Sequence, residues 1–446
     1  MSNEIKPVCV FVGPVSTRSG YGDDARSRVK ALIEWDKFDL KIVPTRWGAT
    51  PMTALDNDDP LSEEIKKRIL TQPLREQPEV HIQVTIPNEF QPQGKYNIGI
   101  TAGIETTLPR AEWIEGLNRM NLNIVPSHFA KEVFEKAAFT KKLPDGRQEP
   151  VKMTKPMEVV FEGVDTKVYR KTDKPSADID QTLEAIPESF CYLFVGHWLQ
   201  GDLGADRKDI GMLVKVFCEV FRGRKNAPAL ILKTSGATFS KIDRDEILKK
   251  IHVIRQSIGD HDLPNIYVIH GDLTPEELNR LYNHPKIKAN VSFTHGEGYG
   301  RPLLEATLSG KPLLTTGWSG HLDFLPADLA NLLPGEVKPI HPSAANEWVI
   351  KESGWFVANY SVAAQKLDDI FTNYLSYLTK AEKLRQQNAE KFTQENESKL
   401  FIQTLEKYLP KFEKKIVPVL PKFKKLGDVT PLTPTLPKFK KIGPTV

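Results

Sequence analysis

Short runs of β-branched and other apolar residues alternate with amphipathic stretches along most of this chain. In the first part, such runs predict strands at residues 8–13, 40–45, 80–86, 96–101, 122–127 and 157–162. Strands that are apolar throughout are typical of sheets buried on both faces. The alternation therefore predicts a parallel sheet covered by helices.

A polar segment with two prolines, at residues 171–189, interrupts this pattern and is interpreted as a linker. A second series of strands is then predicted at 191–196, 229–234, 266–271, 289–294 and 312–317. Between two of them, Thr274, Pro275 and Glu277 have the residue types and spacing of a helix start with a capping box. We therefore expect an α/β protein with two doubly wound, Rossmann-like lobes, residues 1–170 and 190–361, that face a central cleft.

The remaining residues divide into a helical part and a tail. Residues 362–408 predict C-terminal helices that pack back on the first lobe, and residues 409–446 contain the phrase LPKF at Leu409, Leu420 and Leu436. The irregular spacing of this phrase excludes a solenoid, and the surrounding prolines exclude a regular helix, so we expect an extended, flexible tail. A merely solvated tail is the preferred interpretation, and docking to an acidic partner is the alternative.

Composition excludes several classes of protein. The chain has 446 residues, 40% of them apolar and 26% charged, as expected for two globular domains and not for a disordered or fibrous protein. No apolar run approaches the roughly 20 residues of a membrane-spanning helix, and the N-terminus does not resemble a signal peptide, so a cytoplasmic location is expected. The three cysteines, Cys9, Cys191 and Cys218, predict small buried side chains and no disulfide or zinc site.

The net charge of +4 is unevenly distributed, because residues 417–446 hold six lysines and one aspartate, which leaves −1 for the rest. A basic body built to lie along nucleic acid is therefore not indicated. The acidic pairs Asp23–Asp24 and Asp58–Asp59 lack apolar flanks that would bury them. We interpret both pairs as solvated turn residues and expect no metal site.

The strongest chemical signal is the phrase GEGYGRPLLEA at residues 296–306, directly after a predicted strand. Its three closely spaced glycines permit a tight turn that exposes N–H groups, and Pro302 opens a helix whose amino end carries partial positive charge. This predicts a seat for a diphosphate. Glu297 in the loop and Glu305 on the first helical turn would bracket that seat and accept hydrogen bonds from sugar hydroxyls. In the alternative, the glycines serve a plain strand-to-helix turn and Glu305 only favours the helix dipole, but the dipole alone explains neither Glu297 nor the triple glycine.

The phrase is similar to the E-x7-E motif of the retaining glycosyltransferases of family 4, which have the GT-B fold. Five further phrases resemble that family in order and spacing: VPSHFAKEVF (125–134), FEGVDTKVY (161–169), FVGHWL (194–199), HGDLTPEELNRLY (270–282) and SGKPLLTTGWSGHLDFL (309–325). The resemblance covers residues 8–360. It implies that the second lobe binds a nucleoside-diphosphate sugar, with a UDP-sugar as the expected donor, and that the first lobe binds a hydroxyl acceptor.

The resemblance also assigns roles to residues of the two glycine-rich loops. Glu297 would bind hydroxyls of the donor sugar, and Glu305 would hold the ribose. The loop GPVSTRSGYG (13–22) resembles the glycine-rich loop of the first lobe and would place Gly20 and Gly22 near the diphosphate and the acceptor. An ordinary strand-to-helix turn is the alternative. The N–H groups of Tyr299, Gly300 and Arg301 would meet the diphosphate, and Gly298 is expected among the other donor-binding residues.

Departure of a diphosphate requires positive charge, which arginine and lysine supply where no metal does. Family members commonly carry an arginine after the glycine of the FVG phrase, whereas this chain has His197 there, followed by a longer loop. We assign Lys208 to the transfer step and let Arg207 take the place of the missing arginine. Lys233, at the end of the strand at 229–234, is a third candidate, and each could instead be an ordinary surface cation.

The implied front-face mechanism lets the leaving phosphate oxygen help to deprotonate the acceptor, so a protein base is optional and no cofactor or metal is required. Glu105, in the phrase ITAGIETTLPRAEW (100–113), is expected to orient or deprotonate the acceptor, with a helix-start carboxylate as the alternative. His128 follows Ser127, an expected helix cap, and is interpreted as structural.

Two other functions remain as alternatives, a nucleotide-sugar epimerase of the same fold and a catalytically inactive donor-binding scaffold. The E-x7-E phrase is unlike the first, and the presence of both glutamates argues against the second. The acceptor stays open. The basic tail is compatible with a modified base of phage DNA, in which case the protein would act in the host cytoplasm, and a glycan, lipid-linked glycan or protein acceptor is equally compatible.

Overall fold

The computed structural model describes residues 4–56, 59–236, 238–259, 261–413 and 415–416. The chain divides into two units, of which the main one runs from Pro7 to Phe412. In the small unit, strands β1 (Glu4–Ile5) and β18 (Lys415–Ile416) pair antiparallel. Residues 417–446, which make up most of the predicted tail, lie outside the described residues.

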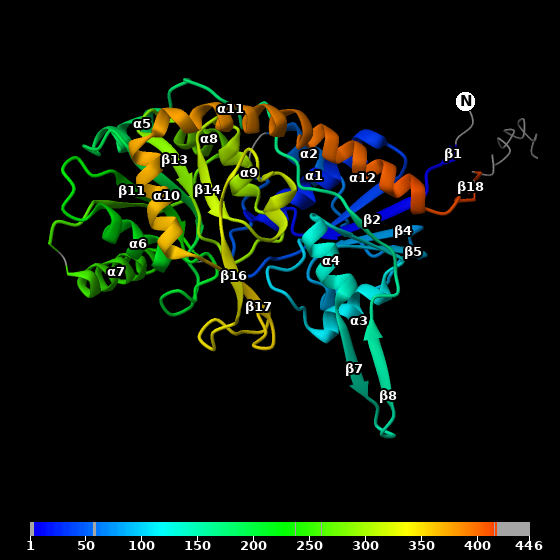
Figure 1. Ribbon diagram of the computed structural model, residues 1–446. Coiled ribbons are helices and arrows are strands. Elements are labelled where there is room, and N and C mark those ends of the chain that lie inside the picture. Colours follow the sequence, from blue (N-terminus) through cyan, green and yellow to red (C-terminus); the bar gives the residue numbers. More distant parts are fainter. Residues whose placement is uncertain (1–3, 57–58, 237, 260, 414, 417–446) are drawn as a thin grey trace, which may run out of the picture. The chain divides into compact units, whose positions relative to one another are not determined.

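The main unit is built on two parallel six-stranded sheets, with strand orders β3-β2-β4-β5-β6-β9 and β12-β11-β10-β13-β14-β15 (Figure 1). The first sheet consists of β2 (Val8–Gly13), β3 (Asp39–Pro44), β4 (Val80–Val84), β5 (Tyr96–Ile100), β6 (Leu122–Val125) and β9 (Met157–Val159). The second consists of β10 (Cys191–His197), β11 (Ala229–Ser235), β12 (Ile266–Ile269), β13 (Ile287–Val291), β14 (Leu313–Thr316) and β15 (Asn331–Leu333). Every predicted strand overlaps one of these, and the α/β prediction is confirmed.

Helices cover both sheets. Those that accompany the first sheet are α1 (Gly20–Trp35), α2 (Pro60–Lys66), the 3-10 helix η1 (Pro87–Glu89), α3 (Ala111–Arg119) and α4 (His128–Lys136). Those that accompany the second are α5 (Ala177–Glu184), α6 (Ile210–Phe221), α7 (Lys241–Ile258), α8 (Pro275–Asn283), α9 (Arg301–Thr307) and the 3-10 helix η2 (Gly320–Asp323).

Strand β10 shows why the strands of these sheets are continuous apolar runs in the sequence. Its first four residues are all buried. Tyr192 and Phe194 pack into one hydrophobic cluster, whereas Cys191 and Leu193 pack into another. Because successive side chains point to opposite faces of a sheet, both faces must be apolar when helices cover both.

Three helices end the main unit: α10 (Tyr360–Thr372), α11 (Tyr374–Lys391) and α12 (Gln394–Tyr408). α12 packs against α1, and its Phe401 and Leu405 are buried in the hydrophobic cluster of the first sheet. Where α11 gives way to α12, Thr393 forms a parallel bridge with Val164. The segment that leads out of the first sheet thus lies beside the segment that returns to it.

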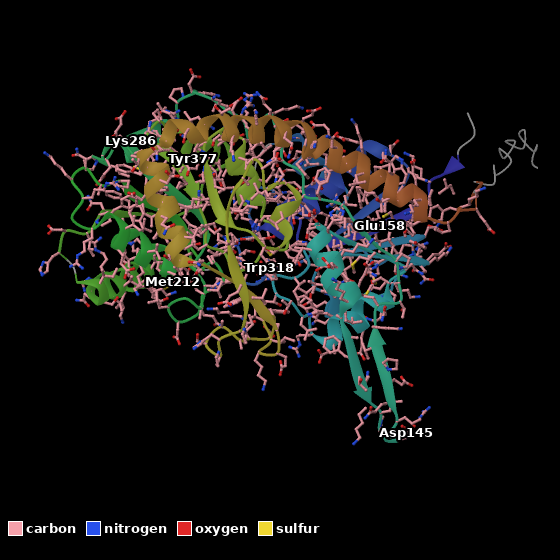
Figure 2. All side chains as sticks on the ribbon, viewed as in Figure 1. Asp145, Glu158, Met212, Lys286, Trp318 and Tyr377 are labelled. Atoms are coloured by element: carbon pink, nitrogen blue, oxygen red, sulfur yellow. The ribbon has the colours of Figure 1, made fainter. Side chains whose placement is uncertain are left out.

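Several features have no counterpart in the sequence prediction, among them strand β15 of the second sheet. The exposed hairpin of β7 (Ala138–Lys142) and β8 (Gln148–Lys152) ends in a turn that contains Asp145 (Figure 2). A second antiparallel pair joins β16 (Gly335–Pro339) and β17 (Gly354–Ala358). Helix α5 lies within the segment interpreted as a linker and buries Ile179 and Leu183. The exposed hairpin and α5 are short and have few apolar positions, which leaves too weak a periodicity to be predicted.

Several local predictions are confirmed. Thr274 and Glu277 form a reciprocal capping box at α8, and the Ser127 hydroxyl caps α4 by accepting from the Ala130 N–H. All three cysteines are free and buried. Across the described residues, no helix is both long and apolar enough to span a membrane.

Candidate active site

The loop from Gly296 to Gly300 connects β13 to α9, and its glycines are required by close backbone contacts. A Cβ atom added to Gly296 would lie 2.1 Å from the carbonyl oxygen of Glu105, and one added to Gly298 would lie 2.2 Å from that of Ala102. Gly300 caps α9 with φ +94°, a conformation that disfavours other residues. The loop of the second sheet therefore lies directly against the segment that follows β5 of the first.

Neighbouring hydroxyl and amide groups hold this loop in place. The Ser127 hydroxyl donates to the carbonyl of Gly298 at 2.6 Å. The N–H of Glu297 donates to the Ser319 hydroxyl at 2.9 Å, and its carbonyl accepts from the Gly320 N–H at 3.0 Å. The backbone of the loop is thus held by the start of α4 and the start of η2.

The Glu297 carboxylate is buried and forms an ion pair with Lys208. Burial acts to raise the pKa of Glu297, but the charges of Lys208 and Arg207 outweigh it, so that the pKa lies below its ordinary value. Burial lowers the pKa of Lys208, and Glu297 opposes that change. At neutral pH, Glu297 is therefore a carboxylate with a cation held against it.

Arg207 and Lys208 lie in the loop between β10 and α6, next to the start of that helix. The Asp206 carboxylate accepts from the N–H groups of Ile210 and Gly211, at 3.0 and 3.2 Å, and so fixes the end of the loop. Arg207 pairs with Glu105, whose pKa is raised by burial while Arg207 and Lys208 act against this. The carboxylates of Glu105 and Glu297 influence one another, so these four side chains form one charge network.

Lys233 and His197 lie at the same edge of the second sheet. The Lys233 ammonium donates to the carbonyl of Gly271 at 2.7 Å, and the His197 ring contacts the Ser235 hydroxyl at 3.0 Å. Burial and the charges of Arg207, Lys208 and Lys233 lower the pKa of His197. The imidazole is therefore neutral at neutral pH, with three cations nearby.

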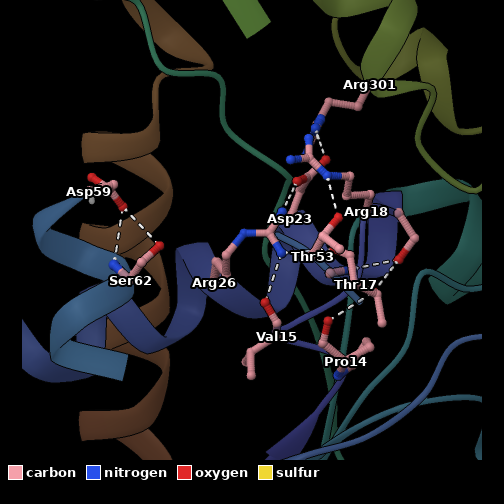
Figure 3. A network of polar contacts seen from close by, with 12 residues as sticks. Pro14, Val15, Thr17, Arg18, Asp23, Arg26, Thr53, Asp59, Ser62 and Arg301 are labelled. Atoms are coloured by element: carbon pink, nitrogen blue, oxygen red, sulfur yellow. Dashed lines mark hydrogen bonds and ion pairs between the residues drawn. The ribbon is translucent and has the colours of Figure 1, made fainter. Parts of the chain in front are cut away.

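Arg301 begins α9, and Glu305 follows one turn later. The Arg301 Nε donates to a Glu305 oxygen at 3.0 Å, and the other end of the guanidinium pairs with Asp23 of α1 (Figure 3). The placement of Glu305 on the first helical turn is wrong, because α9 starts one residue before Pro302 and Glu305 falls on its second turn. The Tyr299 side chain is buried against Phe324 and is not exposed to a ligand at this loop.

The interpretation of the acidic pairs as solvated turns is wrong for Asp23 and Asp24. Both lie on α1, where Asp24 pairs with the buried Arg28 at 2.9 Å and its side chain is 10% exposed. The sequence signal that was missed is the arginine four residues later on the same helix face. Asp59 caps α2 by accepting from the Ser62 N–H at 3.1 Å, and Asp58 lies outside the described residues.

Gly20 and Gly22 of the first glycine-rich loop differ in how closely they are packed. Both lie in the first turn of α1, which the Ser19 hydroxyl caps. A Cβ atom on Gly22 would lie 2.3 Å from the carbonyl oxygen of Thr17, whereas one on Gly20 would meet nothing within 4 Å. Close packing thus requires glycine only at position 22.

His321 and His128 lie near the loop without having been assigned to it. His321 is buried, bonds the Thr316 carbonyl at 2.7 Å and influences the charge of Glu297. His128 contacts Asp323 at 3.1 Å, in keeping with a structural role. Among the described residues, no group of three or more His, Cys, Asp or Glu side chains is placed to hold a metal ion.

A cavity of about 350 Å³ lies away from this loop, between residues 198–211 and α7. Its walls are formed in part by Trp198, Leu203 and Val253. None of the expected donor-binding residues lines it. The cavity therefore gives an independent place to look for a bound ligand.

Glu305 leads to a prediction about pH. Burial raises the pKa of its carboxyl to about 7 from an ordinary 4.5, so between these values the folded protein holds a proton that the unfolded chain has released. The contribution of this bound proton to the free energy of unfolding is complete below the unfolded pKa of 4.5. It is lost as the pH rises through the folded pKa of about 7. In wild type, the free energy of unfolding should fall between about pH 5 and about pH 8, as measured by urea unfolding. In Glu305→Gln we expect this fall to be smaller, by up to about 3 kcal/mol.

The control for this prediction is the exposed Glu336, whose change to Gln should leave the pH dependence of unfolding unaltered. Glu162 and Glu397 have pKa values raised in the same direction, to about 8 and about 7, so part of the wild-type decline should persist. An unchanged pH dependence in Glu305→Gln would show that its carboxyl is not buried in this way.

The sequence matches no protein-family model and no curated protein. Solved structures are similar over most of the chain. The UDP-forming α,α-trehalose-phosphate synthase of Burkholderia xenovorans has a TM-score of 0.58 and 11% identity, covering 91% of this chain and 100% of that one. Sucrose-phosphate synthase of Thermosynechococcus elongatus has 0.58 and 14%, covering 90% and 99%. Anabaena HepE in complex with UDP-glucose has 0.54 and 11%, covering 90% and 100%. The chain therefore has the two-lobed GT-B fold.

Proposed function

We propose that this protein is a retaining glycosyltransferase of family 4, which transfers a sugar from a UDP-sugar to a hydroxyl acceptor. The observation that carries the proposal is the charge network of Glu105, Arg207, Lys208 and Glu297 beside the glycine loop. Its members follow β5, β10 and β13 and so gather at the carboxyl ends of parallel strands, where open α/β sheets bind ligands. The neighbour of like fold that was solved with UDP-glucose supports this donor class.

Within this proposal, the second sheet binds the donor. The N–H groups of Tyr299, Gly300 and Arg301 bind the diphosphate, and Glu305 accepts hydrogen bonds from the ribose. Glu297 binds hydroxyls of the sugar, a role for which an ionised, buried carboxylate is suited because it only accepts. The first sheet supplies Glu105, which orients the acceptor hydroxyl.

In the transfer step, the acceptor oxygen forms a bond to the anomeric carbon on the face from which the diphosphate leaves. The bond between that carbon and the phosphate oxygen breaks, and the leaving oxygen takes the proton of the acceptor. Negative charge accumulates on the diphosphate. Lys208 and Arg207, fixed in advance by their carboxylate partners, stabilise that charge.

The test is incubation with a panel of labelled nucleotide sugars, UDP-glucose among them, alone and with glycans, hydroxymethylated DNA and a protein mixture as acceptors. Release of the nucleoside diphosphate together with a labelled acceptor, whose new bond keeps the donor's anomeric configuration by NMR, is the expected result. An isomerised donor without release would instead indicate an epimerase. Binding without either reaction would indicate a scaffold.

A further inference from the structure

The carboxylate of Asp23 joins the two glycine-rich loops of the molecule. Asp23 lies in the first turn of α1 and pairs with both Arg26 and Arg301 (Figure 3). Arg26 in turn donates to the carbonyls of Val15 and Thr17 at 2.8 and 2.9 Å. An arginine that begins α9 is thus bound by an anion that belongs to the first sheet's half of the chain.

This pairing occurs twice at the candidate active site. Glu105, which follows β5, pairs with Arg207 in the same manner as Asp23 pairs with Arg301. In both pairs the arginine belongs to the proposed donor site and the carboxylate to the segment around the first sheet. Both donor-site arginines therefore already carry an anion in the protein without donor.

The Asp23 pair is accessible enough to be exchanged. The side chain of Asp23 is 34% exposed and that of Arg301 is 22% exposed, whereas the Arg28–Glu397 pair nearby is 2% exposed on both sides. Partly solvated ion pairs cost little to separate, unlike buried ones. A guanidinium binds a phosphate with the same fork of donors that it offers to a carboxylate.

A diphosphate at the start of α9 would meet the negative charge of Asp23. At a separation of roughly 6 Å and an effective dielectric constant of about 40–80, one such charge alters the affinity for a singly charged anion by about three- to tenfold. We propose that Asp23 is an internal anion, which holds Arg301 in the donor-free protein and is displaced from it by the diphosphate of the donor. The inference rests on the proposed function and adds to it a residue that regulates donor binding and product release.

The exchange has a consequence for turnover. After transfer, the nucleoside diphosphate remains bound to Arg301, and the return of Asp23 to that arginine favours its departure. A residue that weakens binding of the product in this way speeds release, which limits the rate of many enzymes. Asp23 thus lowers the affinity for the donor and speeds release of the nucleoside diphosphate.

The test is calorimetric binding of UDP, inorganic pyrophosphate and uridine to the full chain and to Asp23→Asn. We expect UDP and pyrophosphate to bind about three- to tenfold more tightly to the variant, and uridine, which lacks phosphate, to bind equally to both. The gain should shrink as salt is raised, because salt screens partly exposed charges. A role of Asp23 in folding alone would produce neither the phosphate dependence nor the salt dependence.

Glu34→Gln is the matched control, since Glu34 is an exposed carboxylate on the same helix, about 17 Å further along its axis. It should leave all three affinities unchanged. Asp23→Ser, which keeps a residue suited to a helix start, serves as a second variant, and melting temperatures verify folding. Equal or weaker UDP binding in both Asp23 variants overturns the inference alone. Absence of UDP and pyrophosphate binding in every form overturns the proposed function and the inference with it.

Discussion

Replacing Lys208 with alanine lowers the turnover of sugar transfer by about 10²- to 10³-fold, the usual effect of removing one preorganised group that stabilises developing negative charge. Lys208 is held against Glu297, and its side chain is 11% exposed. Water therefore replaces its charge poorly. The measurement is the rate of nucleoside-diphosphate release at saturating donor, with the melting temperature recorded for each variant.

The same substitution leaves Glu297 buried without its partner, which destabilises a protein by about 3–5 kcal/mol at a fully buried site. Lys208→Arg separates the two effects, because it keeps the charge for Glu297 and should restore stability and part of the rate. Lys215→Ala, on the surface of α6, is the control for loss of a lysine. Full turnover in Lys208→Ala, with a fold that melts as wild type does, would remove Lys208 from the mechanism.

Replacing Gly298 with alanine should abolish donor binding and lower the free energy of unfolding by about 1–3 kcal/mol, as overpacking usually does. The added Cβ would lie 2.2 Å from the carbonyl oxygen of Ala102, so the backbone of one segment must move. Movement of the loop also strains the bond from Ser127 to the Gly298 carbonyl. Urea unfolding and calorimetric titration with UDP measure the two effects.

Gly20→Ala is the matched control, because a Cβ atom there meets nothing within 4 Å and the residue lies in a helical turn. It should leave the free energy of unfolding near its wild-type value, because the added atom displaces nothing. If Gly298→Ala behaved like Gly20→Ala, the close contact between the loop and the segment after β5 would not exist in solution.

The sequence predicted the parts of the fold whose pattern is local. Strand β10 is recognisable because helices on both faces require every residue from Cys191 to Phe194 to be apolar. The loop at 296–300 is recognisable from its glycines. Close backbone contacts at Gly296 and Gly298 leave no room for a Cβ atom, so only glycine fits there. Helix α5 and the hairpin of β7 and β8 bury few side chains, so their sequences carry little pattern.

Pairings between distant residues were beyond sequence reasoning. Arg207 and Glu105 were both singled out, yet nothing in their local sequence says that they contact each other across the two halves of the chain. For Asp23, the nearby Arg26 was a local signal that was missed, whereas its distant partner Arg301 becomes visible only after folding. Glu297 was singled out from its residue type and position in the loop, whereas its partner Lys208, whose charge lowers the pKa of Glu297, required the structure.

The central claim is that residues 296–306 bind the nucleotide of a sugar donor, and a crystal structure of the protein with UDP tests it most directly. The account predicts that the diphosphate lies against the N–H groups at the start of α9, within reach of Arg301 and Lys208, with the ribose hydroxyls on Glu305. UDP bound elsewhere, for example in the cavity between residues 198–211 and α7, with the glycine loop empty, would contradict it.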